Sequence, residues 1–142
     1  MTNHQSLLRL KRFRIDDIKR RLETINAMKV DLEKQLSDID ATVAREQQRA
    51  GDSDIGRLAF PSFLRAIEVR RENLRATQKD IEREYEAAQT ALTDAFQDLK
   101  ALEVAGEQRQ KRQEDALARR AQVMLDEVAI VRHLRKHKDT SP

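Results

Sequence analysis

His133 and His137 are the residues whose type and spacing most resemble a metal site in this sequence. A separation of four residues places both imidazole rings on one face of a helix, which is the spacing of zinc ligands in metalloproteases. Such a site also needs a glutamate between the histidines, but the intervening residues are Leu-Arg-Lys, and the sequence has no cysteine to complete another zinc site. We therefore interpret the pair as part of a solvated basic tail, and we expect no metal ion and no cofactor.

Neighbouring carboxylates are the other arrangement that suggests chemistry. Asp16 and Asp17 are adjacent, and Glu82, Glu84 and Glu86 alternate along the chain. In a helix, residues one or two positions apart point to different faces, so neighbouring carboxylates of these sets do not converge on one substrate. None of the five serines and three histidines has the context of a nucleophile, and there is no Gly-rich phosphate loop. The sequence therefore predicts a protein that is not an enzyme.

The composition favours long helices over a compact globule. Of the 142 residues, 37% are charged, only 4% are aromatic and none is tryptophan. The longest apolar run, Val128 to Val131, is far too short to cross a bilayer. These features predict a soluble, cytoplasmic protein.

Two long stretches carry the periodicity of an amphipathic helix. Apolar residues alternate in steps of three and four over residues 8–43 and again over 64–102, so each stretch has a narrow apolar stripe. Neither stripe can be buried by its own helix, and one short break separates the two stretches. The sequence therefore predicts an all-α fold: a long antiparallel two-helix coiled-coil hairpin that forms a single domain over residues 1–142.

The break between the stretches contains residues that end or redirect helices. Gly51, Gly56 and Pro61 lie within it, and the second helix would start with Pro61 at its first position or with Ser62 as its cap. We expect helix 1 over about residues 4–48, a tip over about 51–61 and helix 2 over about 62–137.

The second helix is predicted to extend past the first. Residues 106–115 are almost wholly polar, and a helical apolar stripe then resumes with no segment of the chain left to cover it. The stripe consists of Leu117, Ala121, Met124, Val128 and Val131. This uncovered stripe predicts a binding partner.

Charge is unevenly distributed along the chain. The formal net charge is +5 over residues 1–21, −5 over 22–106 and +3 over 107–142. In a hairpin, both basic segments would lie at the open end. Their charge could contact nucleic acid or an anionic membrane, and it could equally steer the protein into an acidic cavity of a partner protein.

Three runs of the sequence resemble one protein family. They are LLRLKRFRID near the start, LAFPSFLRAIEVRRENL after the break and ALTDAFQDLKALE further along. They resemble the FliJ family of the flagellar type III export apparatus, especially its alphaproteobacterial form, over most of residues 6–103. The most specific part is Phe60, Pro61 and Phe63 followed by the run from Arg70 to Leu74, because heptad repeats alone do not produce this pattern.

The resemblance implies a non-enzymatic stalk in flagellar protein export. Family members are antiparallel coiled coils that enter the pore of the export ATPase hexamer and promote assembly of its ring. They also contact the cytoplasmic domain of the export gate and escort export chaperones. This implies a cytoplasmic protein that is peripherally associated with the inner membrane at the flagellar base.

For the ATPase contact, the basic charge and the uncovered stripe point to residues at the open end. The expected residues are Leu7, Leu10, Lys11, Phe13 and Arg14 from helix 1 and Leu117, Met124 and Val128 from helix 2.

For the gate contact, the family's position on the first turns of helix 2 implies Phe63, Ile67, Arg70 and Leu74. Arg70 and Leu74 depart from the family pattern, where a small residue and a polar ring are found. Ile67 and Leu74 also belong to the apolar seam, so core packing explains them equally well. Phe63, together with Phe60, either closes the end of the seam or docks on the gate.

Two other non-enzymatic functions stay open. Basic residues of the first helix could contact nucleic-acid phosphates without reading the base sequence, although the acidic middle of the chain would repel a duplex. A generic coiled-coil scaffold is the second alternative. We expect no nucleic-acid partner.

Overall fold

The structure is a computed structural model that describes residues 2–139. It consists of two helices, α1 (Asn3–Asp52, 50 residues) and α2 (Asp54–Asp139, 86 residues). Within the described residues only Thr2 and Ser53 lie outside a helix, and there is no strand. The all-α prediction is therefore confirmed, and so is the prediction that helix 2 is the longer helix.

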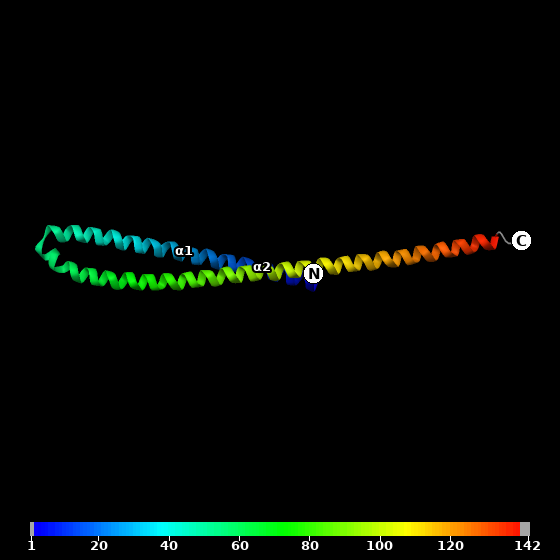
Figure 1. The fold of residues 1–142 in the computed structure, drawn as a ribbon, viewed down its shortest axis with the longest axis horizontal. Helices are drawn as coiled ribbons and strands as arrows, with labels where there is room; N and C mark the ends of the chain where they lie inside the picture. Colours follow the sequence, from blue (N-terminus) through cyan, green and yellow to red (C-terminus); the bar gives the residue numbers. More distant parts are fainter. Residues whose placement is uncertain (1, 140–142) are drawn as a thin grey trace. The chain divides into compact units, whose positions relative to one another are not determined.

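The helices divide into two compact units that are described separately. One unit contains residues 9–97, and the other contains residues 2–8 together with 98–139. In the unit of residues 9–97, α1 and α2 run side by side in opposite directions (Figure 1). This antiparallel packing confirms the predicted coiled-coil hairpin. The prediction of a single domain over residues 1–142 stays a prediction.

A narrow apolar seam holds the hairpin of residues 9–97 together. Its centre is the cluster of Ile25, Leu32 and Ile81, with Leu74 and Tyr85 among the side chains packed against it. Ile25 is only 1% exposed. Because complete burial of such a side chain contributes about 1.5–3 kcal/mol, this periodic seam is the main source of pairing energy between the helices.

The reversal between the helices is made at Ser53. The Gly56 N–H donates to Ser53 Oγ (3.0 Å), and the Arg57 N–H donates to the Ser53 carbonyl (3.1 Å). Ser53 is therefore the N-cap of α2, and Asp54 adds a negative charge to the first turn, where the helix dipole favours it.

The structure corrects the predicted boundaries around the tip. The sequence predicts a tip over about residues 51–61, but α1 extends to Asp52 and α2 already begins at Asp54. Pro61 lies inside α2 as its eighth residue and does not start the helix. The Ser53 cap starts α2 earlier, and the helix continues through Pro61 although this residue removes one backbone hydrogen bond and crowds the carbonyl of Arg57.

The other unit brings the start of α1 against α2. Thr2 and Gln5 form a reciprocal cap, in which the backbone N–H of each donates to the side chain of the other at 3.2 Å. The His4 ring packs against Gly106, where the Cβ atom of any other residue would collide with it. Gly106 therefore leaves space for the His4 ring in this position; a larger residue would require the ring to rotate away.

Candidate interaction surfaces

Polar residues occupy several positions in the apolar seam and link the two helices. Arg71 donates from Nη2 to Asp40 of α1 (2.8 Å) and from Nη1 to Glu68 of α2 (3.0 Å). Lys29 lies over the Tyr85 ring, with Nζ 5.9 Å from the ring centroid. These contacts explain how two basic side chains are accommodated in the seam, because Arg71 pairs with carboxylates and Lys29 lies over an aromatic ring.

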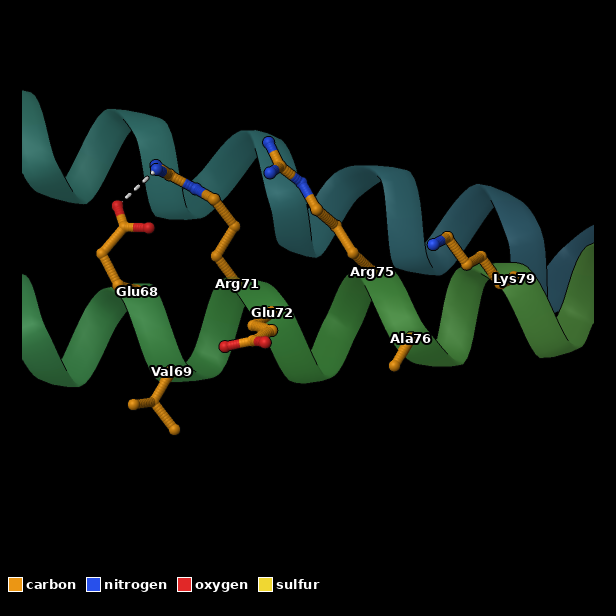
Figure 2. A pocket seen from close by; sticks show the side chains of 7 residues that line it. All are labelled: Glu68, Val69, Arg71, Glu72, Arg75, Ala76 and Lys79. Atoms are coloured by element: carbon orange, nitrogen blue, oxygen red, sulfur yellow. Dashed lines mark hydrogen bonds and ion pairs between the residues drawn. The ribbon is translucent and has the colours of Figure 1, made fainter.

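A shallow hollow on α2 lies beside this ion pair. Figure 2 shows Arg71, Arg75 and Lys79 extending toward α1, whereas Val69 and Ala76 point away from it. The Arg71 guanidinium is held by its two carboxylate partners. The hollow is charged and built from one helix, and it holds no nucleophile with an adjacent base.

The residues predicted to bind the gate differ in their exposure. Phe63, Ile67 and Leu74 are half-buried, and only Arg70 is exposed. Leu74 packs against the central apolar cluster, as its position in the seam requires. The structure thus brings three of the four side chains partly into the seam, and their role in docking stays a prediction.

Phe63 also stacks on Phe60. Their ring centroids are 6.2 Å apart with an angle of 26° between the ring planes. Both rings line a small hollow with Ala50 from the end of α1 and Gly56 from the start of α2. This position closes the turn end of the seam while leaving part of each ring in contact with solvent.

The turn exposes two apolar residues that the sequence interpretation missed. Ile55 is 81% exposed and Leu58 is 82% exposed. Their spacing of three places them on one side of the first turns of α2. They were missed because an irregular tip is expected over residues 51–61, so no helical periodicity applies there.

The ATPase-contact residues predicted in α1 are split between the two units. Leu7 belongs to the unit with residues 98–139, and Leu10, Lys11, Phe13 and Arg14 belong to the unit of residues 9–97. Leu7, Leu10, Phe13 and Arg14 are exposed, whereas Lys11 is half-buried. The Arg20 guanidinium lies 5.9 Å from the centroid of the Phe13 ring. The α1 part of the set therefore offers exposed apolar side chains beside basic ones.

The ATPase-contact residues predicted in α2 lie in a segment that we call the overhang, residues 107–138. Leu117, Met124 and Val128 are all exposed, and Ala116 is the one overhang residue that is not. The overhang also exposes Val123, Leu125, Ile130 and Leu134, which the predicted set omitted. Val123, Ile130 and Leu134 share a second periodicity, which was missed because the sequence interpretation followed only the first stripe. Leu125 belongs to neither.

The histidine pair does not extend into a larger cluster. The His133 and His137 rings meet edge to face, with centroids 4.7 Å apart. Among the residues that the structure describes, no group of three or more His, Cys, Asp or Glu side chains is placed to hold a metal ion. Neither of the described helices contains a stretch long and apolar enough to span a membrane.

A known family accounts for nearly the whole chain. The sequence model of the family described as "Flagellar FliJ protein" matches residues 3–138. The chain belongs to the FliJ family. No curated protein and no solved structure matches it.

FliJ membership confirms the resemblance and agrees with the helical hairpin. It makes the chain a coiled-coil protein of flagellar protein export that interacts with the export apparatus. It also fits the prediction that the chain is not an enzyme, because FliJ proteins are non-enzymatic export components. The alphaproteobacterial form stays a prediction.

Proposed function

We propose that this FliJ-family chain is a stalk that binds the flagellar export ATPase through the unit containing its overhang. In this role it enters the ATPase hexamer and promotes assembly of the ring. It also links the ATPase to the cytoplasmic domain of the export gate and escorts export chaperones. It acts in the cytoplasm, peripherally associated with the inner membrane at the flagellar base.

The observation that carries the proposal is the uncovered apolar surface of the overhang. Leu117, Met124 and Val128 are exposed on a stretch of helix that no other described residue of its unit covers. A cluster of exposed apolar side chains on one segment is typical of a protein-binding surface. Membership in an export family supports the export ATPase as the partner.

The basic residues of α1 support the same partner by a different physical effect. Residues 1–21 carry seven Lys or Arg against two Asp. Long-range attraction by such a segment accelerates encounter with an acidic pore, whereas buried apolar side chains slow dissociation. We therefore propose that Lys11 and Arg14 accelerate association with the ATPase. Leu7, Leu10 and Phe13 would instead slow dissociation of the complex.

A truncated chain lacking residues 107–142 tests the assignment. We expect it to keep the hairpin, because the seam of residues 9–97 forms a compact unit of its own. We also expect it to lose most of its ATPase binding and stimulation, measured by biosensor binding and by phosphate release. Circular dichroism of the truncated chain is the control for folding. If it bound and stimulated the ATPase like the full chain, the overhang would have no such role.

A further inference from the structure

The overhang carries two apolar strips. The first strip is the predicted one: Leu117, Ala121, Met124, Val128 and Val131. The second strip consists of Ala116, Val123, Ile130 and Leu134. At 3.6 residues per turn, the centres of the two strips lie about 120° apart around the helix. The overhang therefore presents two apolar directions.

A charged line separates the strips. Arg120 and Glu127 are seven residues apart, and the helical rotation places both between the first and the second strip. Both side chains are exposed. The strips are thus distinct surfaces, because a partner that spanned them continuously would have to bury this pair.

Both strips are exposed to a similar degree. Met124 of the first strip is 66% exposed, and Ile130 of the second strip is 59% exposed. One partner helix covers a stripe about 100° wide, so it would cover one strip and leave the other in water. Burial of both strips therefore requires two partner segments.

Charge identifies the chemistry of the partner. Residues 128–138 contain four Lys or Arg and no Asp or Glu. Beside the first strip, Met124, Val128 and Val131 line a hollow of about 350 Å³ together with Glu127, Arg132 and Arg135, so two basic side chains and one acidic side chain border it. An apolar side chain fits between the three apolar residues, and carboxylates next to it would pair with the two arginines.

A second copy of the chain fits this surface poorly. In a parallel pair, the basic residues 132–138 of both copies would lie side by side and repel. In an antiparallel pair with Met124 opposite Val128, Arg120 of one copy would face Arg132 of the other next to the apolar contact, and only the more distant Glu114 would face a basic residue, Lys138. A partner with acidic edges avoids both repulsions.

We propose that the overhang binds between two apolar segments of one partner, each with an acidic edge, so that both strips are buried. The inference rests on the proposed function, in which this partner is the export ATPase. It adds Val123, Ile130 and Leu134 to the binding residues and predicts that contact on a single side of the overhang is insufficient.

Three single substitutions in the full-length chain test the proposal. Met124→Ser alters the first strip, Ile130→Ser alters the second strip, and Leu125→Ser is the control. Leu125 is 64% exposed and lies about 80° from the centre of the first strip, on the side away from the second strip, so its substitution removes a similar apolar surface outside both strips. Binding to the purified ATPase is measured by calorimetry, and helical content by circular dichroism.

We expect Met124→Ser and Ile130→Ser each to weaken ATPase affinity about tenfold or more, and Leu125→Ser to change it less than about twofold. If only Met124→Ser weakened binding, the second strip would be free in the complex and the inference would be wrong, while the proposed function would stand. If neither did, the proposed function would fail as well.

Two further results would also overturn the inference. Equal losses from Leu125→Ser and Ile130→Ser would show a general effect of lost apolar surface instead of two binding strips. A dimer of the free full-length chain in analytical ultracentrifugation, if Ile130→Ser dissociated it, would show that a second copy occupies the strip.

Discussion

Gly51 and Gly56 lie on opposite sides of Ser53, and their surroundings differ. A Cβ atom at Gly56 would lie 2.9 Å from Ser53 Oγ and 3.1 Å from both the Ala50 Cα atom and the Arg49 carbonyl oxygen. A Cβ atom at Gly51 would have nothing within 4 Å. Neither glycine has a positive φ, so the difference between them comes from the close approach of the α2 backbone to the end of α1.

This contrast predicts opposite effects of the same substitution. Gly56→Ala should lower the free energy of unfolding by about 1 kcal/mol or more, because backbone atoms at the turn must shift. Gly51→Ala should raise it by up to about 1 kcal/mol, because alanine favours the helix and meets no obstacle. Urea denaturation followed by circular dichroism measures both. A stabilised Gly56→Ala variant would contradict the close approach at the turn.

At the level of the helices, the turn end of the seam combines packing with a candidate docking surface. Phe63 stacks on Phe60 and is half-buried, whereas Arg70, two turns further along α2, is exposed. Loss of packing at the turn and loss of docking on the gate can therefore be distinguished at these two residues. Phe63 contributes to the fold whether or not the gate binds here, and Arg70 contributes little to the fold.

Substitutions at these two positions separate packing from docking. Phe63→Ala should lower the free energy of unfolding by about 1–2 kcal/mol, less than the loss for a fully buried ring. Arg70→Ala should leave stability nearly unchanged. If the gate docks on this face, both variants should bind its cytoplasmic domain more weakly in a pull-down. A loss of stability in Phe63→Ala with normal gate binding by both variants would reject the docking role.

For the whole molecule, the charge distribution indicates that different segments control the association and dissociation rates with the ATPase. The segment of residues 1–21 has a net charge of +5, whereas residues 22–106 have a net charge of −5. Attraction between the basic segment and an acidic partner extends over about a Debye length, roughly 8 Å at physiological salt. The charged segment therefore acts mainly on association, and the apolar strips of the overhang act on dissociation.

Charge reversal of Arg9 and Arg14 to Glu should slow association with the ATPase and make its rate less sensitive to salt. Met124→Asp should instead mainly accelerate dissociation, because it places a carboxylate in an apolar contact. Stopped-flow association and biosensor dissociation, each repeated at several salt concentrations, measure the two effects. A faster dissociation of the Arg9/Arg14 variant with an unchanged association rate would contradict this division of roles.

The sequence by itself determined the two helices, their antiparallel pairing and the uncovered apolar stripe in the second helix. Apolar residues such as Ile25, Leu32 and Ile81 recur with the period of a helix, and this period depends only on local backbone geometry. Because a single short break separates the two apolar stripes, antiparallel pairing of the helices is the simplest way to bury both. The same periodicity identified the stripe of Leu117, Met124 and Val128, which are exposed in the structure.

Only the tertiary structure decided where the chain reverses and which side chains remain exposed there. Ser53 replaces the predicted tip, and Pro61 lies within α2, because the close packing of Gly56 against the end of α1 sets the position of the turn. The partial burial of Phe63 and the space that Gly106 provides for His4 also depend on pairs of residues far apart in the sequence. Helical periodicity does not contain this information, because it relates each residue only to its neighbours within a few turns.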